Sequence, residues 1–150
     1  AGVRGAITTD QSERYDIVFD VAGGVSIVAI SNFITFLENT SGYRQDLRRV
    51  EYGDERDAGM RKYMEEIAPL NNVGRITKPI FIVHGANDPR VPVTEADQLF
   101  AAVKANGQNP WWLVANDEGH GFRKKSNRNY MNAAVALFFR QHLLGDTASN

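Results

Sequence analysis

The stretch that decides the fold of this 150-residue chain is Pro79-Ile-Phe-Ile-Val-His-Gly-Ala-Asn-Asp-Pro-Arg-Val-Pro92. Its first half is an unbroken apolar run, which is typical of a strand buried on both faces of a parallel sheet. Its second half is rich in turn-forming residues and carries Asp88. We therefore expect a buried strand that ends in a polar loop with an acid on it.

A second unit of the same kind follows one predicted helix later. The apolar run Trp111–Ala115 leads into the loop Asn116-Asp-Glu-Gly-His-Gly-Phe122. In an open α/β sheet, the loops at the carboxyl ends of parallel strands meet at one edge, where ligands bind. We therefore expect Asp88 and His120 to lie side by side.

The helices on either side of this second strand are read from apolar spacing and end signals. Thr94 is the predicted N-cap of the first helix, and Gly107 is the predicted residue just past its end. Ser126 is predicted to begin the last helix, which Gly145 ends.

The first half of the chain carries fewer clear signals. Gly2–Thr8 reads as the tail of a helix, and Val21–Ile30 reads as a third buried strand, with a buried helix as the alternative. Ser31–Asn32 is expected to cap a short helix, and Asp57 is expected to cap another that Pro69 ends.

The alternation of strands and helices predicts one α/β domain over residues 1–150, a parallel sheet of about three strands flanked by helices. The formal net charge is −1 and there are no cysteines, so a nucleic-acid surface, disulfides and thiolate metal sites are not expected. No glycine-rich phosphate loop or zinc-site spacing is present, so we expect no cofactor and no metal. No membrane-length apolar run or signal peptide is visible in a chain that begins at Ala1, and we expect a cytoplasmic protein.

Asp88 and His120 each have an ordinary interpretation. The aspartate precedes a proline and could simply hold its own turn, and the histidine between two glycines could be a surface turn residue. As a pair they indicate more, because an acid that orients a histidine is two-thirds of a nucleophilic triad. His84 is interpreted as a residue packed within its strand, and His142 as a residue near a helix C-terminus, where positive charge is favoured.

Two groups of charges leave two interpretations open. The segment Tyr43–Tyr52 is most simply a solvated face, and a cap that contacts substrate is the alternative. Arg90, Arg123 and Lys124 flank the two loops and are either solvated loop charges or contacts for a substrate carboxylate.

The segments Gly85–Pro92 and Asp117–Phe122 together resemble the C-terminal part of the α/β-hydrolase catalytic domain of the prolyl oligopeptidase family of serine peptidases, which includes the acylaminoacyl peptidases. The resemblance runs from about residue 21 to residue 143. It implies that Asp88 is the triad acid, that His120 is the general base and that the substrate is a peptide. Three further segments share it: Gly24–Phe33, Glu51–Asp54 and Ala68–Asn71.

The chain departs from this family at the nucleophile. The family carries its serine in a G-x-S-x-G elbow, and no serine of this sequence stands in that pattern. Ser26 has Gly24 two positions before it but Val28 two positions after it, inside a strand-like run, so we expect it to be structural. We therefore expect a C-terminal catalytic segment that is inactive alone. The serines are Ser12, Ser26, Ser31, Ser41, Ser126 and Ser149.

The missing upstream strand leads to an expectation about partners. It would leave the strand at Val21–Ile30 as an exposed apolar edge, and such edges pair with other chains. We expect a homo-oligomer through this edge. Two alternative functions remain open, a non-catalytic interaction module of the same fold and a small-ester hydrolase.

Overall fold

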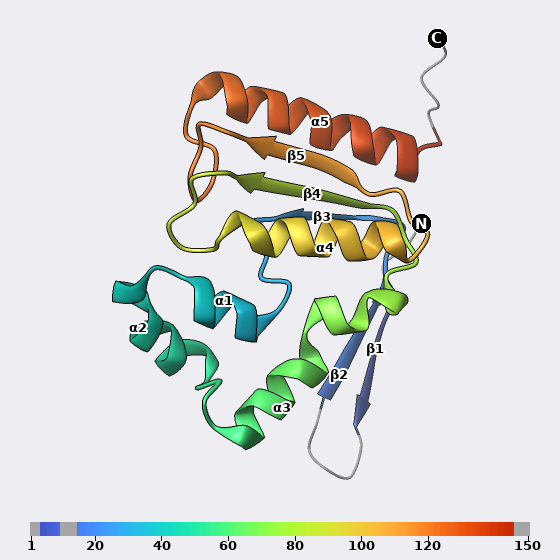
Figure 1. Cartoon of the computed structure of the whole chain (residues 1–150). Helices are drawn as coiled ribbons and strands as arrows, with labels where there is room; N and C mark the ends of the chain where they lie inside the picture. Colours follow the sequence, from blue (N-terminus) through green and yellow to red (C-terminus); the bar gives the residue numbers. More distant parts are fainter. Residues whose placement is uncertain (1–3, 10–14, 146–150) are drawn as a thin grey trace.

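Three parallel strands form the centre of the computed structural model, which describes residues 4–9 and 15–145 (Figure 1). The strand β4 (Ile80–Gly85) lies between β3 (Gly24–Ile27) and β5 (Trp111–Ala115). Both pairings are parallel, so the three C-terminal ends lie at one edge of the sheet. The predicted parallel sheet of three strands is confirmed.

Helices cover both faces of this sheet (Figure 1), α4 (Val93–Ala105) on one and α5 (Lys125–Leu143) on the other. Side chains of β4 alternate between them. Phe81 packs in a buried cluster with Phe138 of α5, whereas Ile82 packs in a separate cluster with residues of α4. Because β4 is buried on both faces, it reads in sequence as the continuous apolar run of a parallel strand.

The segment between β3 and β4 is helical. It contains α1 (Phe33–Asn39), α2 (Gly42–Tyr52), α3 (Ala58–Ile67) and a 3-10 helix (Pro69–Arg75). As predicted, the side chain of Asn32 caps α1 by accepting hydrogen bonds from the amides of the first turn, and Asp57 caps α3 in the same way. A third buried cluster joins α1 and α3 to the loop after β4: Ile34, Phe36, Leu37, Met64 and Val91.

The prediction of a helix tail at Gly2–Thr8 is wrong. The strand β1 (Arg4–Thr9) pairs with β2 (Tyr15–Asp20) in a separate antiparallel sheet. Both segments contain β-branched residues that favour strands, and the pairing between them is not visible in either segment alone. The strand predicted over Val21–Ile30 is confirmed only for its middle, because Val28 takes φ 51° and ends β3.

Two predicted helix starts differ from the structure. The prediction of Thr94 as N-cap is wrong, because α4 already begins at Val93 with Pro92 in the capping position. Thr94 lies within the first turn, and no side chain caps this helix by a hydrogen bond. The last helix begins at Lys125, one residue before Ser126.

The charged segment expected as a solvated face forms α2, which has no buried residue. Within residues 4–9 and 15–145, no helix combines the length and the apolar character that a membrane crossing requires.

Candidate active site

The loop after β4 presents Asp88 in a fixed orientation. Its side chain is fully buried, and its Oδ1 accepts hydrogen bonds from the amides of Arg90 (2.8 Å) and Val91 (3.1 Å). The turn-holding role that the sequence suggested for this aspartate is therefore present. It occupies only one carboxylate oxygen and leaves Oδ2 free for another partner.

That partner is His120, from the loop after β5. Its Nδ1 lies 2.8 Å from Oδ2 of Asp88, as expected from the order of strands and loops. An ionised carboxylate only accepts hydrogen bonds, so Nδ1 carries the proton and donates it. Nε2 of the neutral ring is then an unprotonated acceptor. The His120 side chain is 32% exposed while that of Asp88 is 0% exposed, which is the arrangement of a buried acid that orients an accessible base.

The two loops approach each other closely because Gly85 has no side chain. A Cβ at this position would lie 2.2 Å from the carbonyl oxygen of Gly119 and 2.8 Å from that of Glu118. Asn87 adds two bonds between the loops, from its amide to the Glu118 carbonyl (2.9 Å) and from its side chain to the Asn116 carbonyl (2.6 Å). The glycine therefore sets the separation of the loops that carry the acid and the histidine.

A buried glutamate organises the histidine loop. Glu118 is 4% exposed and accepts hydrogen bonds from the amides of Arg123 and Lys124, each at 2.9 Å, and from the side chain of Asn127. These contacts hold the loop that carries His120 and connect it to the start of α5. The backbone donors, Arg123 first, hold the pKa of the Glu118 carboxyl below its usual value.

The acid loop is held from its other side by the end of α1. Thr40 donates its hydroxyl to the carbonyl of Arg90 at 3.0 Å, and Ser41 donates to the carbonyl of Pro89 at 3.1 Å. Asp88 therefore lies in a loop whose backbone is bound by α1 on one side and by the His120 loop on the other.

A pocket of about 470 Å³ opens beside His120 and is lined by several charged side chains. Lys124 pairs with Asp117 at 2.5 Å, so these two charges compensate each other, raising the pKa of the lysine and lowering that of the aspartate. Arg90 and Arg123 are exposed. The charged lining residues are Arg44, Arg90, Asp117, Glu118, Arg123 and Lys124. The flanking cations that the sequence identified thus surround the histidine, with Arg44 of α2 added.

Two of the described serines, Ser31 and Ser41, bond partners other than His120. Ser31 is fully buried and donates its hydroxyl to the side chain and carbonyl of Glu95, and Ser41 donates to the acid loop. Ser26 lies within β3, as expected. Ser12 and Ser149 lie outside the described residues. In the parts of the chain that the structure describes, no hydrogen bond joins a serine hydroxyl to His120.

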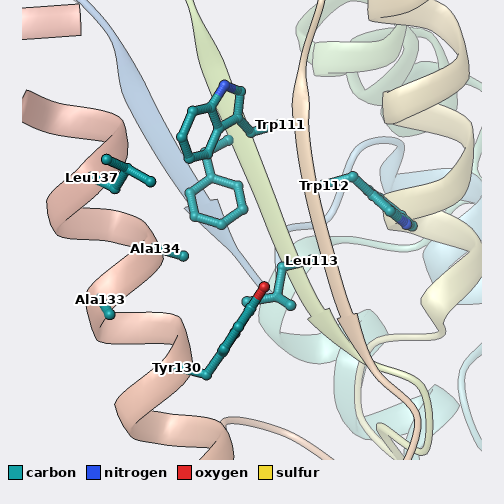
Figure 2. Close-up of a pocket in the computed structure, with 8 residues that line it drawn as sticks. Trp111, Trp112, Leu113, Tyr130, Ala133, Ala134 and Leu137 are labelled. Carbon is teal, nitrogen blue, oxygen red and sulfur yellow. The ribbon is translucent and has the colours of Figure 1, made fainter. Parts of the chain in front are cut away.

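A second pocket, of about 360 Å³, lies away from this site at the open edge of β5 and is lined mainly by apolar residues. Figure 2 shows Ala134 and Leu137 of α5 pointing toward Trp111, while Trp112 lies on the other side of β5. There Trp112 packs on Phe100 of α4, with ring centroids 4.8 Å apart. Among the residues the structure describes, no group of three or more His, Asp or Glu side chains is arranged to hold a metal ion.

Sequence reasoning identified Asp88 and His120 but missed the groups that hold them. Glu118 stands two positions before His120 in the loop after a strand, and this position was the available signal. The contacts of Thr40 and Ser41 with the acid loop cross 50 and 48 positions and leave no local pattern.

Comparison with known proteins gives matches over most of this chain. The model of the prolyl oligopeptidase family matches residues 4–146. The chain is 38% identical over 130 residues to dipeptidyl peptidase family member 6 of Caenorhabditis elegans and 37% identical over 129 residues to dipeptidyl aminopeptidase BIII of Pseudoxanthomonas mexicana. These matches cover 84% and 83% of this chain but only 18% of each relative.

A solved puromycin-hydrolyzing peptidase of Mycobacterium tuberculosis superposes with a TM-score of 0.73 at 26% identity, over 81% of this chain and 18% of that one. The fold is thus part of an α/β-hydrolase domain. The match of the family model begins at residue 4 and so includes β1 and β2, before the motifs that carry the resemblance in the sequence. The chain belongs to the prolyl oligopeptidase family of peptidases.

Proposed function

We propose that this chain is the acid- and base-bearing C-terminal segment of a serine peptidase, with Asp88 as the triad acid and His120 as the general base. The observation that carries the proposal is the 2.8 Å bond from His120 Nδ1 to the buried Asp88 carboxylate, with the ring itself partly exposed to the pocket.

The proposed chemistry follows from the tautomer of His120. With Nδ1–H bonded to Asp88, Nε2 can take the proton of a serine hydroxyl as that oxygen attacks a peptide carbonyl. The imidazolium formed is stabilised by the Asp88 anion, and it then gives the same proton to the leaving amine. Peptides are the proposed substrates because the family and the relatives' names are those of peptidases.

The nucleophile is proposed to come from a G-x-S-x-G elbow outside these 150 residues, since none is present in the sequence. The isolated chain then has an acid and a base but no nucleophile and no oxyanion donors beside it. We expect negligible peptide hydrolysis from it.

The first test is intact mass after incubation of the chain with a fluorophosphonate, which labels activated serines. We expect no adduct on a chain that circular dichroism shows to be folded. An adduct on any serine, lost in the His120→Ala variant, would show that the chain is a complete hydrolase and overturn this part of the proposal.

The second test uses a longer protein in which an upstream elbow precedes this sequence. There, Asp88→Asn is expected to lower kcat by about 10⁴-fold, because the amide favours the wrong tautomer of His120, and His120→Ala by at least as much. Activity within tenfold of the parent for both variants would refute the assigned roles. Equal loss on peptide and on small-ester substrates is expected, because the same acid and base serve both.

We also propose that the isolated chain associates through the edge of β3. This strand pairs only with β4 among the described residues, and Ile27 is 44% exposed. An exposed strand edge with an apolar side chain favours pairing with a second copy. In light scattering, Ile27→Lys is expected to convert an oligomer into a monomer, whereas Trp112→Lys on the opposite edge is not. A monomeric parent chain at micromolar concentration would contradict this proposal.

A non-catalytic interaction module is the second candidate for the chain alone. The observation that favours it is the absence of the elbow from the sequence. It predicts no labelled serine in the isolated chain and no gain of hydrolysis when an elbow-bearing upstream segment is supplied, whereas the peptidase proposal predicts a gain.

A further inference from the structure

His84 is a buried titratable residue that the proposed chemistry does not use. It is the last residue but one of β4 and is fully buried. Its Nε2 lies 3.0 Å from the carbonyl oxygen of Val91. A carbonyl oxygen only accepts hydrogen bonds, so Nε2 carries a proton and donates it. Nδ1, the other ring nitrogen, is buried without a hydrogen-bond partner among the described residues, which leaves it as a bare acceptor.

Simple packing does not explain a histidine here. A phenylalanine or leucine would fill similar space without burying an unpartnered nitrogen, and an unpartnered buried polar atom costs free energy. The one polar contact that His84 makes is therefore the feature that distinguishes it from an apolar residue at the same position.

That contact leads directly to the acid. Val91 accepts from His84 through its carbonyl and donates through its amide to Oδ1 of Asp88, at 3.1 Å. In addition, Nε2 of His84 lies 3.8 Å from Oδ2 of Asp88, the same oxygen that accepts from His120 at 2.8 Å. This separation is too long for a hydrogen bond, but it places the positive end of an N–H dipole beside the carboxylate. Asp88 thus lies between two imidazole rings, one buried and one partly exposed.

We propose that His84 is a positioning residue for the Asp88–His120 pair. Its fixed Nε2–H holds the carbonyl of Val91, and the amide of the same residue orients the Asp88 carboxylate so that Oδ2 faces Nδ1 of His120. This inference rests on the proposed function, because it describes how the proposed acid is kept in place.

The test is made by NMR on the 150-residue chain with ¹⁵N-labelled histidine, so it needs no turnover. The reporter is the downfield proton on Nδ1 of His120, identified by its loss in His120→Ala. Three variants distinguish the effect of the hydrogen bond to Val91 from the effect of side-chain volume at position 84. His84→Phe fills the space without a donor, His84→Gln places an amide nitrogen about as far from the backbone as Nε2, and His84→Asn places one about as far as Nδ1.

We expect the reporter proton to exchange with water at a similar rate in the parent chain and in His84→Gln, and at least tenfold faster in His84→Phe and His84→Asn. A residue that only packs would change the unfolding midpoint in these variants without changing this rate. Equal exchange rates in the parent and in folded His84→Phe would therefore overturn the proposal.

The parent chain alone gives a further readout, which does not depend on the variants folding. The ¹⁵N shifts of His84 are expected to show a protonated Nε2 and an unprotonated Nδ1. The opposite tautomer, or a doubly protonated ring, would overturn the role of His84 while leaving the Asp88–His120 pair intact. Absence of the His120 reporter from the folded parent chain would instead refute that pair, and with it both proposals.

Discussion

Two regions of this molecule hold negative charge in different ways. At the loop edge, which we define as the loops after β3, β4 and β5 together with the first turn of α4 (residues 28–32, 86–95 and 116–124), three buried carboxylates accept hydrogen bonds from backbone amides. Asp88, Glu95 and Glu118 each accept two such bonds. On the charged flank, which we define as residues 42–56, the acids instead face arginine side chains.

On the charged flank, arginine side chains hold the acids and shift the pKa values of both partners. Arg49 bonds Glu55 and Asp46 at the same time, and these carboxylates raise its pKa above the usual range. Arg56 holds Asp54 and lowers its pKa to about 2. The Arg56–Asp54 pair is exposed to solvent, so its interaction is screened by salt and can adapt to loss of one partner. Glu55 is the buried exception on this flank, and its partner is the Arg49 side chain.

Backbone amides cannot adapt in this way, because their positions belong to the fold. A carboxylate that they hold has one orientation, and its removal leaves buried donors without partners. The carboxylates of the loop edge are therefore fixed in position, whereas an exposed ion pair of the flank such as Arg56–Asp54 can rearrange. Four predictions test this difference, from the largest expected effect to the smallest.

The largest effect is expected from a methyl group at the closest approach of the two loops. In Gly85→Ala the new Cβ would meet two backbone oxygens, so the loops must separate. We expect a loss of about 3 kcal/mol in the free energy of unfolding by urea. Gly42→Ala, at the start of α2, meets nothing within 4 Å and is expected to change it by less than about 0.5 kcal/mol. Similar losses in both variants would remove the distinction between the regions.

The second effect concerns Glu95, the carboxylate that holds the loop after β3. Its Oε2 accepts from the amides of Ser31 (3.0 Å) and Asn32 (2.9 Å). In Glu95→Ala both donors lose their partner, and we expect a loss of about 3 kcal/mol in urea unfolding. Glu38→Ala, which removes an exposed partner of Arg61, is the control and is expected to cost less than about 0.5 kcal/mol. A cost for Glu95→Ala as small as that of its control would contradict the comparison.

The third effect is a dependence of stability on pH and salt. The pKa of Glu118 is lowered by backbone donors and that of Asp117 by Lys124. A carboxyl with a lowered folded-state pKa stabilises the fold above its usual pKa, and this contribution is lost as the pH falls through the lowered value. The melting temperature of the parent chain should therefore fall as the pH is lowered from about 5 to about 3. This dependence on pH is expected to be weaker in both Glu118→Gln and Asp117→Asn.

Salt distinguishes these two variants. The effect of Glu118→Gln on the pH dependence of the melting temperature is expected to persist in about 0.5 M NaCl, whereas the effect of Asp117→Asn is expected to disappear. An equal response of the two variants to salt would show that backbone and side-chain partners hold these acids alike.

The smallest effect is expected on the surface. Arg61 lies 3.3 Å from Glu38 and 3.8 Å from Glu65, with side chains 45 to 54% exposed. Arg61→Ala should lower the free energy of unfolding by about 0.3 kcal/mol at low salt, and by nothing measurable in about 0.5 M NaCl. A loss above about 1 kcal/mol would show that exposed ion pairs matter more here than the comparison allows.

The sequence by itself determined the central strands and the identities of the two candidate catalytic side chains. The runs that became β4 and β5 are continuously apolar because both faces of a parallel sheet are buried, and the turn-forming residues after them mark where Asp88 and His120 emerge. The parallel order of strands then placed both residues at one edge. These are local patterns, so they can be read without knowing the rest of the fold.

Only the tertiary structure decided the contacts between segments that are distant in the sequence. Ser31 and Glu95 are 64 positions apart, and no pattern in either segment predicts their contact. Likewise, β1 and β2 appear as strands only because each is the other's partner, and His84 reads as a packed strand residue until its bond to Val91 is seen. The physical reason is common to all three. A hydrogen bond between distant segments depends on the direction of both groups in space, whereas a sequence pattern records only the environment of each segment.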